Sequence, residues 1–182
     1  MILRKVNALR NRTMSTEIPQ AQSLGHVVIT GGCGFLGHHI VSLLLERHPS
    51  TRISVLDLRT NRNRNLSNDV SYYDTDITAP DDVNELLARL RPDVVIHTAS
   101  PVFNANRPEL MYKVNVGGTK NMLEAARGAG VKAFVYTSSA SIIMDATAEL
   151  VNADERWPIV TGDAQPEYYS TTKVCNVCVS RS

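Results

Sequence analysis

Short apolar runs alternate with longer amphipathic stretches through most of the chain. Five runs rich in β-branched or aromatic residues predict strands, at 26–30, 52–57, 70–74, 93–98 and 131–137. Between them, apolar residues recur every three or four positions, which predicts helices at 35–47, 80–90 and 108–128. The run at 93–98 is apolar at consecutive positions, as is typical of a strand buried on both faces of a parallel sheet.

Residues that begin and end helices flank these stretches. Pro49 follows the first helix, and Gly128 and Gly130 follow the third. Before the second helix, Thr78 is expected to cap the N-terminus, with Pro80 in the first turn. The boundaries therefore agree with the periodicity.

The alternation of strand and helix predicts the fold class. A helix between two strands returns the chain to the same edge of the sheet, so that the strands run parallel. We therefore expect an α/β protein with a doubly wound parallel sheet, the Rossmann fold, in the order 3-2-1-4-5. In such sheets, ligands bind beyond the carboxyl ends of the strands.

Four glycines follow the first predicted strand, at positions 31, 32, 34 and 37. Gly31 suits a tight turn, Gly34 lets a dinucleotide pyrophosphate approach the backbone, and Gly37 lets the next helix pack closely on the strand. The N–H groups that open this helix, at Phe35, Leu36 and Gly37, would face the phosphates at the positive end of the helix dipole. The pattern predicts a dinucleotide site; the alternative is a structural turn.

The second predicted strand ends in an acidic residue, Asp57. It lies about 20 residues beyond the glycine turn, where dinucleotide-binding folds place the carboxylate that binds the adenosine ribose. Arg59 follows in a loop with further arginines at 62 and 64, and its guanidinium group could bind the 2′-phosphate of NADP. Because Asp57 would repel that phosphate, NAD is the expected cofactor and NADP the alternative.

Tyr169 and Lys173 are the candidate catalytic pair. They are four residues apart, which places both on one face of a helix. An ammonium group beside a phenol favours the phenolate, a base for an alcohol proton, and the hydroxyl of Ser139 could hold the substrate oxygen. With a bound nicotinamide, the implied reaction is hydride removal from a carbinol carbon. Taken alone, the Tyr-x-x-x-Lys spacing is also common in surface pairs.

A series of motifs resembles that of the extended short-chain dehydrogenase/reductase family. The motifs are TGGCGFLG at 30–37, VLDLR at 55–59, DI at 76–77, HTASP at 97–101, NVGGT at 115–119, YTSSAS at 136–141 and YSTTK at 169–173. Within this family they are similar to the 3β-hydroxysteroid dehydrogenase branch, especially its fungal sterol-4α-carboxylate 3-dehydrogenases. The resemblance extends over about residues 24–173.

The resemblance implies a role for each matching residue. Ser139 would orient the substrate, Tyr169 would be the catalytic acid/base, and Lys173 would assist it and bind the cofactor ribose. His97 would be packed rather than catalytic, and Asn115 would be structural or part of a proton relay. The other implied cofactor contacts are Asp76 and Ile77 at the adenine, and Thr98, Ala99 and Ser100 beyond the fourth strand.

The activity implied by the resemblance is NAD(P)-dependent oxidation of a 3β-hydroxysteroid in sterol biosynthesis. In the sterol-acid subgroup the product is a β-keto acid, which loses carbon dioxide readily. A sugar-nucleotide epimerase, a dihydroflavonol-type reductase and a non-catalytic dinucleotide-binding protein are the alternatives. We expect a small sterol-like substrate and a location in the cytoplasm or at the cytosolic face of the endoplasmic reticulum. Membrane association through a C-terminal region and a homodimer are left open.

Composition narrows the picture further. With 182 residues, 43% of them hydrophobic, the chain suits one domain, and its net charge of +1 does not indicate a nucleic-acid partner. Three cysteines do not form a disulfide framework, and the Cys175–Cys178 pair lacks the second ligand pair that a zinc site needs. No metal site and no membrane-spanning segment are therefore expected.

Both ends of the chain differ from the central 24–173, the expected NAD(P)-binding domain. Residues 1–23 form a basic leader, expected to be disordered, that resembles a short transit peptide; alternatively, Met14 is the true start. Members of the family continue for well over a hundred residues beyond the lysine. We therefore expect 174–182 to be an aberrant tail, and the chain to be a truncated, weakly active or inactive form without the C-terminal substrate region.

Overall fold

The computed structural model describes residues 22–102, 107–145, 150–154 and 156–179, with side chains up to 175. Most of the predicted basic leader lies outside the described residues. The strands are β1 (His26–Thr30), β2 (Arg52–Asp57), β3 (Val70–Asp74), β4 (Val94–His97) and β5 (Ala133–Tyr136). The helices are α1 (Phe35–Arg47), α2 (Pro80–Leu90), α3 (Pro108–Met111), α4 (Thr119–Gly128) and α5 (Tyr168–Val179). A π-helix, η1 (Tyr112–Gly118), joins α3 to α4, and two short 3-10 helices are η2 (Ala140–Ile143) and η3 (Gly162–Ala164).

The five strands form one parallel sheet in the order β3-β2-β1-β4-β5. The predicted Rossmann fold and strand order are therefore confirmed. Thr30, the last residue of β1, lies opposite Leu56 of β2 and His97 of β4. Because the register aligns the strand ends, the segments that follow β1, β2 and β4 meet at one edge of the sheet.

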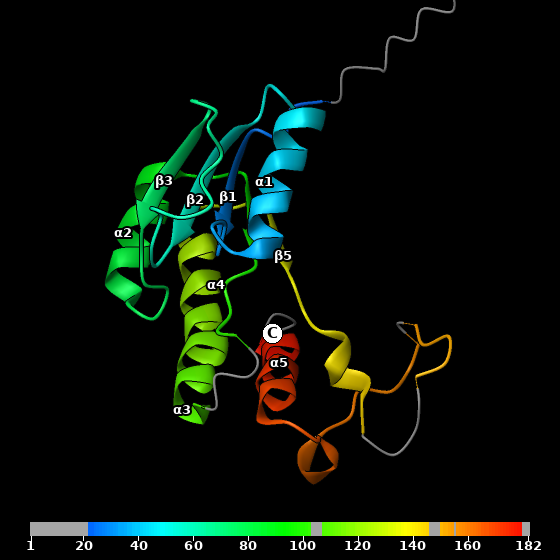
Figure 1. Ribbon diagram of the computed structural model, residues 1–182. Helices are drawn as coiled ribbons and strands as arrows, with labels where there is room; N and C mark the ends of the chain where they lie inside the picture. Colours follow the sequence, from blue (N-terminus) through cyan, green and yellow to red (C-terminus); the bar gives the residue numbers. More distant parts are fainter. Residues whose placement is uncertain (1–21, 103–106, 146–149, 155, 180–182) are drawn as a thin grey trace, which may run out of the picture.

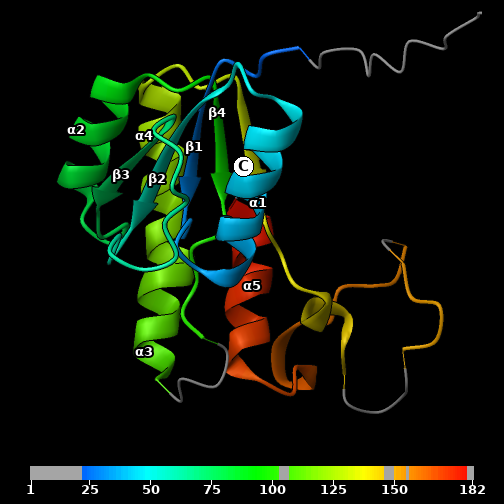
Figure 2. The same ribbon diagram turned by 45° about the horizontal axis from the view of Figure 1, so that its top comes forward.

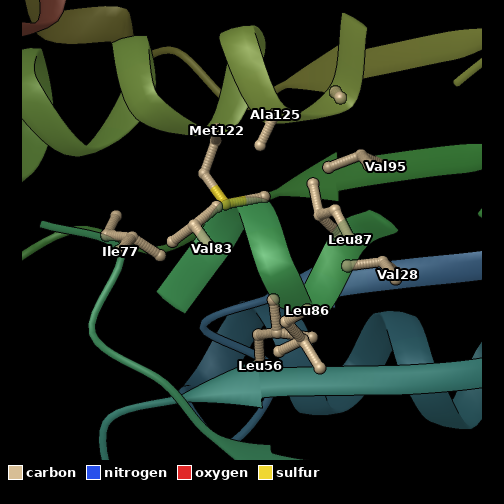
Figure 3. Packing of buried hydrophobic residues seen from close by; sticks show 10 residues of the cluster. Val28, Leu56, Ile77, Val83, Leu86, Leu87, Val95, Met122 and Ala125 are labelled. Carbon is tan, nitrogen blue, oxygen red and sulfur yellow. The ribbon is translucent and has the colours of Figure 1, made fainter. Parts of the chain in front are cut away.

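Helices cover both faces of this sheet (Figures 1 and 2). α1 lies on one face, whereas α2 and α4 lie on the other. Figure 3 shows the larger apolar cluster, in which Met122 of α4 and Leu87 of α2 meet Val28 and Val95 of the sheet. α5 runs along α3 and η1, beyond the carboxyl ends of the strands (Figure 2). No helix in the described part of the chain is long and apolar enough to cross a bilayer.

The start of α2 differs from the prediction. Ala79 rather than Thr78 is the N-cap residue, and it makes no side-chain capping bond. Asp76 organises the turn before the helix, because its carboxylate accepts the N–H of Thr78 at 2.8 Å and its carbonyl accepts the N–H of Ala79 at 3.0 Å. The predicted Thr78 cap is therefore wrong, whereas Pro80 occupies the first turn as expected.

Two helices contain features that periodicity did not indicate. The helix predicted at 108–128 is continuous but widens into the π-helix η1. In α1, Phe35 and Leu36 are exposed and Gly37 and Val41 make the buried contacts. The N-terminal turn of α1 therefore presents apolar side chains to solvent, beside the glycine turn.

Candidate functional site

The glycine turn has the tight geometry expected of it. Gly31 has φ of +68°, and an added Cβ atom would lie 2.8 Å from the Cα atom of Ala99. At Gly37, an added Cβ atom would lie 2.6 Å from the Cα atom of Gly32, so that only glycine lets α1 pack on the turn. The N–H of Gly34 donates to the carbonyl of Gly31 at 3.0 Å. The backbone of β1, β4 and α1 therefore converges on this turn.

The N-terminus of α1 is open for an anion. Its first N–H groups lack acceptors within the helix, as at any helix start, and its first turn holds no acidic residue. Gly34, Phe35 and Leu36 are exposed there. This end of a 13-residue helix can bind a pyrophosphate through N–H groups and the helix dipole, although the contact itself stays a prediction.

Asp57 joins the end of β2 to the turn. Its carboxylate accepts the N–H of Cys33 at 3.1 Å and that of Arg59 at 3.4 Å. Burial and the negative charge of Asp57 raise the pKa of the Cys33 thiol to about 11. The carboxylate is thus fixed beside the turn, in the position expected for a ribose ligand, and the Arg59 side chain is exposed nearby.

The structure places the predicted adenine contacts in two environments. Asp76 is exposed, whereas the side chain of Ile77 is only 6% exposed and packs in the apolar core. Gly118 of η1 lies so close that an added Cβ atom would be 2.7 Å from Ile77. The side-chain amide of Asn121 also donates to the carbonyl of Ile77 at 3.0 Å, so that Asp76 is the more accessible of the two predicted contacts.

The segment after β4 packs against the glycine turn. Thr98 donates its hydroxyl to the carbonyl of Thr30 at 2.6 Å, and the N–H of Ala99 donates to the Thr30 hydroxyl at 3.3 Å. Ser100 donates its hydroxyl to the side-chain oxygen of Asn115 at 3.0 Å. The predicted contacts Thr98, Ala99 and Ser100 are thereby held at the carboxyl end of the sheet.

His97 is a packed residue, not an acid/base group. Its Nδ1 lies 2.6 Å from the hydroxyl of Thr30, and its Nε2 lies 3.0 Å from that of Thr119. Burial, with a smaller contribution from the positive charge of Lys173, lowers the pKa of His97 to about 3. The imidazole is therefore neutral at physiological pH and links β1, β4 and α4.

Lys173 brings the candidate catalytic residues together. Its amine lies 5.7 Å from the ring centre of Tyr169 and 5.1 Å from that of Tyr136. It donates to the carbonyl of Thr137, at the end of β5, at 3.2 Å. Only 3% of the residue is exposed, and this burial lowers its pKa to about 8. At pH 7 the mostly cationic amine of Lys173 therefore lies between the Tyr169 ring of α5 and the residue that follows β5.

Ser139 caps the short 3-10 helix η2, which packs against α5, the helix of this pair. Its hydroxyl lies 2.8 Å from that of Ser141 and accepts the N–H of Ser141 at 3.2 Å. The end of β5 thus carries the third predicted group next to the helix of Tyr169 and Lys173, although its substrate contact stays a prediction.

Comparison with known proteins gives a family for this arrangement. The 3-beta hydroxysteroid dehydrogenase/isomerase family matches residues 28–178, which include the glycine turn, Asp57, Ser139, Tyr169 and Lys173. The chain belongs to this family. It is 38% identical over 145 residues to the decarboxylating sterol-4-alpha-carboxylate 3-dehydrogenase of Candida albicans, and 36% identical over 164 residues to that of Bos taurus. The matches cover 76% and 90% of this chain but 41% and 42% of these relatives, so that the chain spans about two fifths of their length.

Solved structures share the fold of this family member. The UDP-glucose 4-epimerase of Thermus thermophilus, in complex with NAD, is 30% identical with a TM-score of 0.75, over 86% of this chain and 50% of that one. The WbmG enzyme of Bordetella bronchiseptica, in complex with NAD, matches with a TM-score of 0.73 at 20% identity, over 85% of this chain and 48% of that one. The WbmG match shows only the shared fold.

The structure of this 3-beta hydroxysteroid dehydrogenase family member also contains a link that sequence analysis missed. The side-chain amide of Asn115 donates to the hydroxyl of Thr172 at 2.9 Å, and that hydroxyl donates to the carbonyl of Tyr169 at 2.7 Å. Asn115 is only 1% exposed and also accepts from Ser100. Asn115, predicted to be structural or a relay, therefore joins the segment after β4 to the helix that carries Tyr169.

Thr172 gave no signal in the sequence beyond its place inside YSTTK. A threonine next to the lysine is equally compatible with an exposed position. Its contact with Asn115, which lies in the π-helix η1, becomes visible only in the tertiary structure. A second missed residue, Asn63, lies in the arginine loop and contacts the glycine turn. Both act through contacts between segments at least 30 residues apart.

Proposed function

We propose that this chain is the cofactor-binding part of an NAD-dependent dehydrogenase that oxidises the 3β-hydroxyl of a sterol. The proposal is carried by one observation: the buried Lys173 amine lies 5.7 Å from the ring centre of Tyr169, on a helix tied to the segment after β4. Relatives named sterol-4-alpha-carboxylate 3-dehydrogenase are 34–41% identical, and two named 3 beta-hydroxysteroid dehydrogenase type 7 are 38% and 39% identical. The first group supports a sterol 4α-carboxylic acid as the substrate.

The residues at the carboxyl end of the sheet suit an adenine dinucleotide. Gly34 leaves the backbone open, the start of α1 offers N–H groups to a pyrophosphate, and the fixed Asp57 carboxylate offers acceptors to two ribose hydroxyls. The same carboxylate disfavours a 2′-phosphate, so that NAD rather than NADP is the proposed cofactor. The NAD complex of the Thermus thermophilus epimerase, which is 30% identical to this chain, supports this assignment.

The catalytic step uses three side chains of this chain. Ser139 holds the substrate oxygen, and Tyr169 takes the hydroxyl proton on its phenolate oxygen. Lys173 stabilises the phenolate with its positive charge, which acts strongly because the amine is removed from water. NAD, when bound, accepts the hydride from C3. A 3-keto product with a carboxyl at C4 is a β-keto acid, and its ketone accepts the electrons released as carbon dioxide leaves.

We assign substrate selection to the parts of the relatives that this chain does not match. We therefore expect residues 1–182 to bind NAD and to turn over a 3β-hydroxysterol far more slowly than a full-length relative. A sterol substrate also supports a location at the cytosolic face of the endoplasmic reticulum, where a lipid-soluble substrate is at hand.

The experiment combines calorimetry with a reductase assay. Purified chain is titrated with NAD and NADP, and reduction of NAD is followed at about 340 nm with a 4α-carboxysterol present. Conversion of UDP-glucose to its 4-epimer, which causes no net reduction of NAD, is followed separately by chromatography. NAD binding with slow reduction by the sterol, abolished in Tyr169→Phe, supports the proposal. Absence of NAD binding contradicts it. Sugar epimerisation at a higher rate than sterol oxidation would favour an epimerase, the function of the Thermus thermophilus relative.

A further inference from the structure

The loop between β2 and β3, residues 58–69, contacts the glycine turn through Asn63. The side-chain amide nitrogen of Asn63 donates to the main-chain carbonyl of Cys33 at 3.0 Å. The carbonyl of Asn63 accepts a hydrogen bond from Nδ1 of His38, on α1, at 2.8 Å. Asn63 therefore contacts both the turn and the helix that it opens.

The backbone of Asn63 shows that this contact is specific. Its φ of +46° lies in the left-handed region, which a residue with a side chain adopts only at a cost. Asparagine tolerates this conformation better than most residues. In this conformation, the side-chain amide of Asn63 donates one hydrogen bond and its main-chain carbonyl accepts another. The strained residue is thus the one that reaches the turn.

The other side of the loop is tied to the edge strand β3. The N–H of Thr60 donates to Asp74 at 2.8 Å, and the N–H of Asn65 donates to the Tyr72 hydroxyl at 2.7 Å. The guanidinium group of Arg64 lies 4.4 Å from the ring centre of Tyr72. The loop is therefore held between β3 and the glycine turn.

The consequence for the turn is that Cys33 is held at both of its backbone groups. Its N–H donates to Asp57, and its carbonyl accepts from Asn63. The next residue, Gly34, begins the helix end that would face the pyrophosphate. A turn held in its binding conformation before the ligand arrives loses less entropy on binding.

We infer that Asn63 is a positioning residue for the dinucleotide: it locks the glycine turn from the arginine loop and thereby sets the affinity of the chain for the ADP part of the cofactor. The inference rests on the proposed NAD site. It adds a residue outside the glycine and Asp57 motifs that sequence analysis identified.

The test compares three variants with the wild-type chain. Asn63→Gly keeps the left-handed backbone but removes the amide donor, and Asn63→Asp keeps the shape but faces the Cys33 carbonyl with a negative oxygen. Asn61→Asp is the matched control, because it adds the same charge to the same loop at an exposed side chain. Dissociation constants for NAD and ADP-ribose are measured by calorimetry.

We expect NAD and ADP-ribose to bind about threefold more weakly to Asn63→Gly and about tenfold more weakly to Asn63→Asp, as for the loss of one hydrogen bond without or with repulsion. Asn61→Asp should bind like the wild-type chain. The unfolding temperature of the ligand-free variants should stay within about 2 °C of the wild type, which separates positioning from a general loss of stability.

A second readout reports on the turn without any ligand. Cys33 is buried, and its pKa of about 11 keeps it protonated at pH 8, so that it should react slowly with a thiol reagent. Mass spectrometry of the Cys33 peptide should show at least about tenfold faster labelling in both Asn63 variants, because the turn opens more often. The Asn61 control should label like the wild type.

The outcomes separate the inference from the proposed function. If the wild-type chain binds no NAD, the proposed function fails and the inference fails with it. If the wild type binds NAD, and the Asn63 variants bind it equally well with unchanged Cys33 labelling, the inference alone is wrong. Weaker binding together with faster labelling, confined to the Asn63 variants, supports it.

Discussion

At the scale of single residues, the site depends on side chains whose protonation is set by burial. His97 and Lys173 both lie inside the protein at the carboxyl end of the sheet, and desolvation lowers the pKa of each. His97 consequently serves as a neutral link between hydroxyls, whereas Lys173 keeps most of its charge near pH 7. The same desolvation thus leaves the two side chains in different protonation states, because their ordinary pKa values, 6.5 and 10.5, differ.

Asp57 offers the simplest residue-scale prediction. Asp57→Ala removes the ribose acceptor and also releases the N–H of Cys33, so that NAD should bind at least about tenfold more weakly. The 2′-phosphate of NADP should be rejected less, because the repelling charge is gone. Calorimetry with both cofactors measures the ratio of the two affinities; an unchanged ratio would contradict the assignment of Asp57.

His97 predicts how stability depends on pH. The unfolded chain protonates this residue near pH 6.5, but the folded chain does so only near pH 3. Below about pH 6 the unfolded state therefore binds more protons, and the free energy of unfolding should fall by up to about 1.4 kcal/mol per pH unit. Urea unfolding between pH 7 and 4.5 measures the slope.

The control for this prediction follows the imidazole itself. NMR titration of the folded wild type should show His97 neutral down to about pH 4. Protonation of His97 in the folded chain near pH 6.5 would contradict the prediction that burial lowers its pKa.

At the scale of elements, α1 and α5 each make one close contact at the carboxyl end of the sheet in addition to their other packing. α1 depends on Gly37 against the backbone of the turn, and α5 on the bond of Thr172 to Asn115. Both contacts lie at the carboxyl end of the sheet. The helices are therefore held most precisely where they carry candidate functional groups.

Two glycines give opposite predictions. Gly31→Ala places a Cβ atom 2.8 Å from Ala99 at a φ of +68° and should destabilise the fold by more than about 2 kcal/mol. Gly128→Ala, at the end of α4 with nothing within 4 Å, should stabilise it by up to about 1 kcal/mol. Urea unfolding of both variants tests the prediction, and equal effects would contradict it.

Thr172→Val tests the attachment of α5. The change keeps the shape but leaves the buried amide of Asn115 without its acceptor, which should cost about 1–3 kcal/mol. Hydrogen exchange of the α5 amides should accelerate, whereas the sheet should exchange as before. Thr171→Val, on the neighbouring and more exposed position, is the control, and matching exchange in the two variants would rule out a specific role for Thr172.

At the scale of the whole molecule, the two faces of the sheet are covered unequally. α2 and α4 cover one face, and α1 covers only part of the other. On the α1 side, Val135 of β5 is 49% exposed next to Ile96 of β4. Parallel sheets are normally covered on both faces, so this patch is an apolar surface that the described residues leave open.

The open patch predicts self-association of residues 1–182. Val135→Lys should lower the apparent mass seen by light scattering at high protein concentration, because it charges the exposed apolar surface. Val151→Lys is the matched control, since Val151 is 64% exposed in a segment away from the sheet. A lysine at Val151 that reduces association as much as one at Val135 would contradict the prediction.

Much of this organisation could be predicted from local patterns. Alternating apolar runs and helical periodicity predicted the five strands, the Rossmann fold class predicted their order, and the series of motifs indicated the family. The spacing of the glycines predicted a turn in which Gly31 has a positive φ and Gly37 a close contact. These features depend on residues near one another in the chain, whose conformational preferences are visible in the sequence. The cofactor contacts and the catalytic roles stay predictions.

Only the tertiary structure decided which distant residues complete the site. Asn63 meets Cys33 across 30 positions, Asn115 meets Thr172 across 57, and His97 meets Thr30 across 67. Hydrogen bonds between side chains depend on how strands and helices pack. Packing brings together residues that are far apart in the sequence, and no local sequence pattern indicates that they will be in contact.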